Sequence, residues 1–394
     1  MTVETEEFSS MKRKLILRDS LTFLSLLLVT VVLFLITLFL FRSFVSHRQE
    51  LAQRWSARGQ VSLNAGHPDQ AIVALRTALS YAPGRRDYEL LLAQALGDAG
   101  HTDESYNYYL SLWETQPGDG LINLKLARLA AKKNDTQTAI NYYRASIYGT
   151  WEGDGTVRRR EVRLELSKYL LARHDLASAR TELLIAGGNA PDDTAIALTL
   201  APLLEQANVP RDALTYYQKV LTQDPKNQTA LEAAARLEYD SGHFEDADRM
   251  MEQAIREHKS DDSNQEPITP GDKEMLDNAS RILAIAPLKK LPNDERVARI
   301  LKARDLAKKR LDACNTTLSI ASGLPSPLQD LRAKWTSKEA TLNRTVLLND
   351  PTEQDATMLL IFDTESQTAK ICGAPTGDDA LLLLLARTPK ALEP

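Results

Sequence analysis

Histidines are the side chains whose spacing first suggests chemistry in this sequence. Four of the six lie in similar settings, directly after a glycine or an arginine: His67, His101, His174 and His243. Several imidazoles can share one metal ion only if each reaches it at about 2 Å. Each of the four belongs to a separate block of the chain, and packed helices lie about 10 Å apart. We therefore interpret them as turn residues and expect neither a metal site nor a cofactor.

The cysteines offer a second kind of chemistry. Cys314 and Cys372 are the only two in 394 residues. A nucleophilic cysteine needs a base, and no histidine follows His258, so catalysis is disfavoured. A disulfide between the two would close a loop of 57 intervening residues and would suit an exported region, whereas two buried thiols would suit the cytosol. The sequence leaves both alternatives open.

Glycine-rich and acidic stretches complete the candidates for catalysis. Residues 372–379 carry the glycines of a phosphate loop but lack the Lys-Ser/Thr ending that binds phosphate and magnesium. We instead predict that Thr376 and Asp379 form a capping box at the start of a helix over 378–387. Acidic pairs lie at turns or helix starts, where carboxylates cap helices: Asp192-Asp193, Asp261-Asp262 and Asp378-Asp379. No catalytic residue is predicted.

The elements that carry these side chains follow a period of 34 residues. The small residue that opens the second half of each block, called the anchor below, is Ala71, Ser105, Ala139, Ala179, Ala213 or Ala247. Four of the five intervals are 34 residues, and the other is 40 because six extra residues lie within 149–159. Small residues twelve positions before each anchor and large apolar residues four positions after it follow the same period. The pattern indicates repeated structural units.

Each block is predicted to form a helical hairpin. Its second half carries apolar residues at i, i+4 and i+7, which lie on one face of a helix. Small residues at the crossing point allow the two helix backbones to approach closely. Helix breakers separate the halves at Gly66, Gly100, Asn134, Asn208 and Gly242, and prolines close four blocks at Pro83, Pro117, Pro191 and Pro225. The hairpins should stack into an all-α solenoid.

These residues resemble the tetratricopeptide repeat, whose pattern is helix, turn, helix over 34 residues with small residues at three places and a final proline. In the first block the matching residues are Trp55, Gly59, Gly66, Ala71, Ala78 and Pro83. The third and sixth blocks depart from the pattern because they end in Trp151 and Lys259. The resemblance implies six repeats, at 52–85, 86–119, 120–153, 160–193, 194–227 and 228–261.

The resemblance also implies a concave groove, lined by the outward positions of each first helix. These positions hold Gln60, Asn64, Gln94, Asp98, Arg128, Lys132, Lys168 and Arg236. In some family members the corresponding side chains bind the carboxylate of a peptide C-terminus. The groove is therefore predicted to bind an acidic segment of a partner protein. The alternative is that these residues form ordinary solvated helix faces.

The N-terminal region is predicted to anchor the chain in a membrane. A polar tail over 1–20, with both acidic and basic residues, precedes 21 uncharged residues at 21–41. A helix of that length spans roughly 30 Å, the thickness of the hydrocarbon core. An apolar run this long exceeds the core of a signal peptide, so we predict an uncleaved transmembrane helix. The short basic tail favours a cytoplasmic N-terminus, with the repeats on the outer, periplasmic or extracytoplasmic, side.

Beyond the repeats, a polar loop over 262–273 is predicted to lead into a helical C-terminal region, 274–394. Its helices are expected at 274–285, 293–318, 327–348, 353–362 and 378–387, with prolines between them. The apolar runs 358–362 and 381–385 should bury against each other or against the last repeat. This region would then cap the open end of the solenoid.

Composition agrees with a binding protein. The net charge of −5, with interspersed signs, gives no basic surface for nucleic acid. We predict a non-enzymatic, membrane-anchored scaffold or adaptor that binds proteins or peptides in its groove, in assembly of a cell-envelope complex. The alternative is an enzyme, or the regulatory subunit of one, with its active or ligand site in 274–394.

Overall fold

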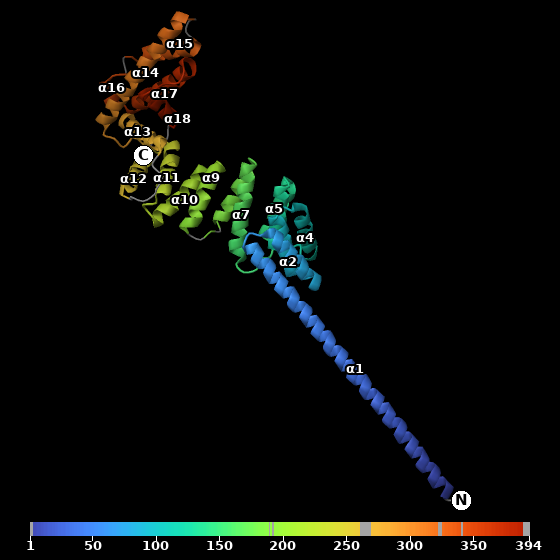
Figure 1. The fold of residues 1–394 in the computed structure, drawn as a ribbon. Coiled ribbons are helices and arrows are strands. Elements are labelled where there is room, and N and C mark those ends of the chain that lie inside the picture. Colours follow the sequence, from blue (N-terminus) through green and yellow to red (C-terminus); the bar gives the residue numbers. More distant parts are fainter. Residues whose placement is uncertain are drawn as a thin grey trace. The chain divides into compact units, whose positions relative to one another are not determined.

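The computed structural model describes residues 3–188, 190, 193–260, 269–321, 325–339 and 342–388. In these residues the chain forms eighteen helices and no strand. It divides into two compact units, Met1–Leu166 and Ser167–Pro394, with the division inside α7. The fold is an all-α solenoid of helical hairpins with a helical C-terminal cap and one long apolar N-terminal helix (Figure 1).

Unit 1 contains the long N-terminal helix and the first hairpins. Its helices are α1 (Val3–Asn64), α2 (Pro68–Tyr81), α3 (Arg86–Asp98), α4 (Thr102–Thr115), α5 (Gly120–Lys132), α6 (Thr136–Tyr148) and the first part of α7 (Gly155–Ala172). Each helix from α1 to α5 contacts the next. Figure 1 shows α1 extending away from the other helices of this unit. Its last turns form the first half of the first hairpin, so no linker separates the apolar stretch from the repeats.

Each hairpin turns through one residue in the left-handed backbone conformation. These residues are Gly66 (φ 74°), Gly100 (87°), Asn134 (60°), His174 (59°), Asn208 (58°) and Gly242 (85°). All six lie five positions before an anchor residue. Five of them are the predicted helix breakers. The sixth position holds a histidine, His174, instead of glycine or asparagine. Residue type therefore does not predict this turn, although the repeat period gives its position.

Replacing His174 by glycine is expected to stabilise the protein. A residue with a Cβ atom pays roughly 1 kcal/mol or more in the left-handed conformation, whereas glycine does not. His174 is exposed, and its side chain has no recorded partner among the described residues. The free energy of unfolding measured with urea should rise by about 1 kcal/mol. Ala145→Gly, at an exposed position inside α6, should instead cost about 1 kcal/mol; a loss of stability in both variants would contradict the assignment.

Small residues let the helices of a hairpin cross closely, as their spacing predicted. A Cβ atom added to Gly59 would lie 2.6 Å from Cγ of Leu75, well inside van der Waals contact. In the second repeat the anchor is a serine, and the buried Ser105 hydroxyl donates to the carbonyl oxygen of Ala93 at 2.6 Å. A polar anchor is therefore tolerated because its hydrogen bond is satisfied inside the hairpin.

The third repeat ends differently because Trp151 replaces the closing proline. Its indole ring covers Gly120, where an added Cβ atom would lie 2.4 Å from the ring, and its Nε1 donates to the carbonyl of Ser146 at 2.9 Å. Gly120 N donates to Thr150 O, and Thr150 N donates to Gly118 O, both at 2.8 Å. The extra residues of the 40-residue interval thus start with a backbone pairing that joins two inter-repeat loops.

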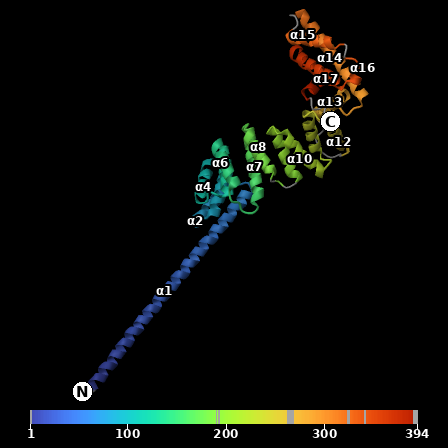
Figure 2. The same cartoon turned by 180° about the vertical axis from the view of Figure 1, so that it is seen from behind.

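Unit 2 contains the later hairpins and the C-terminal helices. The hairpins comprise the rest of α7, α8 (Leu176–Gly188), α9 (Thr194–Gln206), α10 (Pro210–Gln223), α11 (Gln228–Asp240) and α12 (Phe244–Ser260). The cap comprises α13 (Pro270–Ile285), α14 (Asn293–Ala321), α15 (Ser326–Lys338), α16 (Arg344–Asn349), α17 (Pro351–Cys372) and α18 (Asp378–Arg387). Figure 2 shows the same helices from behind.

One hydrophobic core joins the cap to the last repeat. Phe244 of α12 lies in the same buried cluster as Ile282, Met358, Ile361 and Leu385 of the cap. The apolar runs of α17 and α18 are therefore buried as expected, against each other and against the last repeat. Burial of these runs covers the end of the solenoid, which would otherwise expose an apolar face.

Several predicted boundaries in the cap are wrong. Helix α13 begins at Pro270, with Thr269 as its N-cap, so the predicted loop over 262–273 ends earlier; 261–268 lie outside the described residues. The single helix predicted over 327–348 is two helices, because Asn343 caps a new helix by accepting from Val346 N at 3.0 Å. Helix α17 runs ten residues past its predicted end. Two of these boundaries follow local capping signals, at Thr269 and Asn343, which the prediction overlooked.

The capping box predicted for α18 is also wrong. Gly377 is the N-cap residue, with φ at +63°, and no side chain caps the helix. Asp379 instead has a buried carboxylate oxygen without a hydrogen-bond partner among the described residues. Asp378 pairs with Arg281 of α13 at 2.8 Å. Asp378 therefore attaches α18 to α13, and neither acidic residue caps the helix.

A disulfide joins Cys314 near the end of α14 to Cys372 at the end of α17, with the Cα atoms 5.8 Å apart. Cys314 is buried and Cys372 is exposed. Of the two alternatives that the sequence left open, the structure contains the bonded pair.

Candidate partner-binding surface

Helix α5 of unit 1 carries three cations on one face. Lys125, Arg128 and Lys132 have i, i+3 and i+7 spacing, which aligns their side chains along the helix. Two of the three, Arg128 and Lys132, belong to the predicted groove, whereas Lys125 was not predicted. We call these three residues the α5 cation row.

Arg128 is occupied by an ion pair within the fold. Its Nε donates to Glu165 Oε1 at 2.8 Å and its terminal nitrogen donates to Glu165 Oε2 at 2.6 Å, so the pair is bidentate. Tyr143 also donates to Glu165, at 2.8 Å. Burial pushes the pKa of Glu165 upward, but these hydrogen bonds outweigh it and hold the pKa below its usual value. Donating hydrogen bonds to the Glu165 carboxylate raises the pKa of Arg128. Arg128 therefore joins α5 to α7.

Lys125 of the row forms no ion pair with a described residue. It is partly buried, and no described residue accepts a hydrogen bond from its Nζ. Burial lowers its pKa, and the neighbouring Arg128 lowers it further, against the smaller opposing effects of Asp98 and Glu165. A partly desolvated ammonium group without a close anion gains more from an added carboxylate than a fully hydrated one does.

Lys132 lies at the end of the row toward α3. Its Nζ is 3.5 Å from the carbonyl oxygen of Gly97, which is a long contact, and its side chain is exposed. Asp98, also predicted for the groove, is exposed on α3 and acts on Lys125 through its charge. Helices α3, α5 and α7 thus present Asp98, the α5 cation row and Glu165 on one surface of unit 1.

The other predicted groove residues are not all part of this surface. Gln60 donates to Asn64 at 3.1 Å on α1, so the two amides partly satisfy each other, and Gln94 is partly buried on α3. Lys168 and Arg236 belong to unit 2. Arg236 lies 3.5 Å from the buried carboxylate of Asp272, which ties it to α13 of the cap. That cation has a structural partner, which the groove prediction did not anticipate.

The repeat period contains the signal for the residues that the sequence prediction missed. Lys125 and Glu165 both lie fourteen positions before an anchor residue, Ala139 and Ala179 respectively. The prediction used only the positions eleven and seven before the anchor. Including the position fourteen before each anchor, one turn closer to the helix start on the same face, would have added both residues to the predicted groove.

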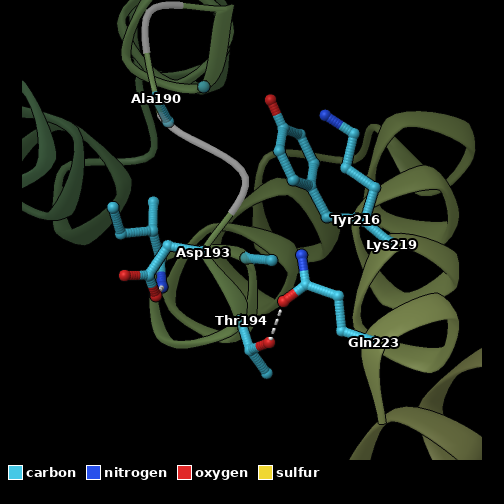
Figure 3. Close-up of a pocket in the computed structure, with 9 residues that line it drawn as sticks. Ala190, Asp193, Thr194, Tyr216, Lys219 and Gln223 are labelled. Atoms are coloured by element: carbon cyan, nitrogen blue, oxygen red, sulfur yellow. Dashed lines mark hydrogen bonds between the residues drawn. The ribbon is translucent and has the colours of Figure 1, made fainter. Parts of the chain in front are cut away.

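A small cavity in unit 2 lies between α8, α9 and α10 (Figure 3). Its volume is about 10 Å³, which is enough for a single water molecule. Thr194 donates to Gln223 at 2.7 Å on one side of it, and Asp193 caps α9 by accepting from Ala195 N at 2.7 Å. The Tyr216 hydroxyl lies over Gly187. The cavity is too small for an organic ligand.

The turn histidines lie where the repeat period places them. His67 and His101 directly precede α2 and α4, and His243 Nδ1 lies 2.6 Å from the buried carboxylate of Glu238. Across the described ranges, no three histidine, cysteine, aspartate or glutamate side chains are grouped as metal ligands.

Helix α1 is the one helix, in the part of the chain that the structure describes, that is long and apolar enough to cross a membrane. None of its most apolar 18-residue window is buried inside the structure. The apolar side chains of 21–41 are exposed along it. This segment includes the predicted transmembrane span, and α1 also takes in most of the predicted polar tail.

The tetratricopeptide-repeat family model matches residues 204–265. Similar solved structures include PilF of Pseudomonas aeruginosa (18% identity over 55% of this chain and 95% of that one, TM-score 0.39). YrrB, described as a TPR protein with an unusual peptide-binding site, has 15% identity, coverage of 53% and 98%, and a TM-score of 0.38.

A repeat protein of Cytophaga hutchinsonii has 12% identity over 80% of this chain and 96% of that one, with a TM-score of 0.42. No curated protein sequence matches the chain. The family match falls on α11 and α12 and on the helices beside them, which form the hairpins described above. The chain contains tetratricopeptide-repeat sequence at residues 204–265.

Proposed function

We propose that this protein is a non-enzymatic, membrane-anchored scaffold that binds an acidic segment of a partner protein along the α5 cation row, in assembly of a cell-envelope complex. The observation that carries the proposal is Lys125, a partly buried cation without an anionic partner among the described residues. Lys132 lies two turns further along the same face. A carboxylate bound between them would supply the missing charge-assisted hydrogen bonds.

Arg128 has a different part in this proposal. Because Glu165 already binds its guanidinium group at both oxygens, Arg128 orients α5 against α7 and keeps the row in place. Removing Arg128 would leave Glu165 partly buried without its cation, which destabilises the fold as well as changing the surface. Lys125 and Lys132 are therefore the better positions for a test.

Replacing Lys125 and Lys132 together by glutamate is expected to abolish capture of the partner. Two reversed charges would repel the acidic segment where two cations would attract it. The measurement is crosslinking and pull-down of the full chain from membranes, with the partner identified from the wild-type sample. Arg144→Glu is the matched control, since Arg144 is exposed on α6 of the same unit without a recorded partner. Equal capture by wild type and the double variant would refute the proposal.

The proposed anchor is α1, with the N-terminus in the cytoplasm and the repeats on the outer side. Its unbroken run from the apolar stretch into the first hairpin supports a position of the repeats close to the bilayer. The disulfide supports an oxidising compartment for unit 2, since such bonds are rare in the cytosol. Protease digestion of spheroplasts tests the orientation: cleavage of the repeats in intact spheroplasts is expected, and their protection would reverse the assignment.

A further inference from the structure

We propose that a cleft in the cap of unit 2 binds an apolar side chain of an acidic partner segment. The cleft has a volume of about 650 Å³, within the range of sites that bind small molecules or several side chains. It lies between α11 of the last repeat and helices α13, α17 and α18 of the cap. The inference rests on the proposed scaffold function and gives that function a second contact point.

The walls of the cleft are mainly apolar. Leu381 and Leu384 of α18 and Ala369 of α17 line it, together with Tyr239 of α11. Leu384 and Ala369 are only partly buried, so the fold itself does not cover this surface completely. A leucine or phenylalanine side chain from a partner would remove apolar area of these residues from water, which is the main source of binding energy at such sites.

Two cations stand at the edge of the cleft. Lys370 and Arg387 line it from the last turns of α17 and α18, and both side chains are exposed. Neither has a recorded hydrogen bond or ion pair with any other described residue. Carboxylates next to the bound apolar side chain would complement them, and a basic segment would be repelled. The occupant is therefore an apolar residue flanked by acidic residues.

The cleft begins on a helix face that also carries a predicted groove residue. Tyr239 follows Arg236 by three positions on α11, so the two side chains lie on one side of that helix. The cation of Arg236 is engaged by Asp272 at 3.5 Å, whereas the rim cations of the cleft are available. A partner segment bound along α11 would thus reach the apolar cleft and the cations Lys370 and Arg387 at the cap.

The test is fluorescence anisotropy of a labelled octapeptide, Gly-Ser-Leu-Phe-Glu-Asp-Glu-Gly, with the full chain in nanodiscs of neutral lipid. Binding is expected, and it should weaken about tenfold or more when lysines replace the acidic residues or serines replace Leu and Phe. Lys370→Glu with Arg387→Glu should weaken it to the same extent. Lys370→Gln with Arg387→Gln should weaken it less, and these two side chains make no recorded contact whose loss would unfold the cap.

The outcomes separate this inference from the proposed function. Arg144→Glu, at an exposed position of unit 1 outside both surfaces, should leave octapeptide affinity unchanged. If the Lys370 and Arg387 variants lose the octapeptide while Lys125→Glu with Lys132→Glu still captures the partner, the cleft is kept and the proposed function is refuted. Equal affinity for the acidic and basic peptides, or no effect of the Lys370 and Arg387 variants, would overturn the cleft.

Discussion

Replacing Cys314 and Cys372 by serine is expected to lower the free energy of unfolding of unit 2 by about 4 kcal/mol. The disulfide closes a loop with a sequence separation of 58 residues, and a loop of that length loses about this much entropy in the unfolded chain when it is crosslinked. Urea titration followed by the fluorescence of Trp335 measures the effect. Trp335 is buried in the core of the cap and is the only tryptophan after residue 166.

Reduction provides the control for the cysteine variant. Wild type in excess dithiol should unfold at the same urea concentration as the double serine variant, and the variant itself should not respond to dithiol. The repeats of unit 1 carry no cysteine, so tryptophan signals from Trp55, Trp113 and Trp151 should be unaffected. Identical unfolding of oxidised wild type and variant would show that the bond contributes nothing in the folded protein.

Acidification is expected to stabilise the cap through Glu365. This carboxyl group is fully buried on α17, and neither oxygen has a hydrogen-bond partner among the described residues. Burial, with the charge of Asp379 next, raises its pKa to about 7, against the attraction of Arg310. Because the pKa in the folded state lies above the usual 4.5, the stabilisation is complete below about pH 4.5 and is lost as the pH rises through about 7.

The free energy of unfolding of the cap is expected to fall by about 2 to 3 kcal/mol from about pH 5 to about pH 8. Each unit of pKa shift corresponds to about 1.4 kcal/mol. Glu365→Gln removes the charge and should flatten this dependence, with higher stability than wild type at about pH 8. Trp335 fluorescence in urea measures it as before. Glu339→Gln, at an exposed position, is the control and should leave the pH dependence unchanged.

The surroundings of Glu365 explain why Arg310 does not neutralise it. Arg310 lies 3.5 Å from a Glu365 oxygen, but its Nε donates to Thr368 at 3.0 Å and its terminal nitrogen donates to the carbonyl of Gly373 at 2.7 Å. Burial also raises the pKa of Asp379, which adds to the same trend. If acidification does not stabilise the wild-type cap relative to Glu365→Gln, Glu365 is ionised in the folded state throughout this range.

The same burial bears on the alternative of an enzyme in the C-terminal region. A carboxyl group with a raised pKa can act as a general acid, but it must reach a substrate. Glu365 is enclosed in the core and does not line the cleft of the cap. We therefore interpret it as a structural residue, and no described residue of the cap carries a specific indication of catalysis.

The amino-acid sequence by itself determined the hairpins and their turns. A helix period, a small residue at each crossing and a breaker between the halves are all local features, and each repeat contacts mainly its neighbours, so local signals suffice. The repeat period predicts a turn at position 174 as well, although a histidine is not a typical turn residue. The apolar stretch at 21–41 is equally local, because length and composition decide it.

Tertiary structure decided which charges remain available. Glu165 reaches Arg128 only because the 40-residue interval still brings α7 beside α5, and Asp272 reaches Arg236 only because α13 packs on the last repeat. Both contacts join residues far apart in sequence, and no spacing rule predicts them. The disulfide and the burial of Glu365 likewise depend on how α14, α17 and α18 pack. The candidate surface therefore extends along α5 to Lys125, because long-range pairing occupies Arg128.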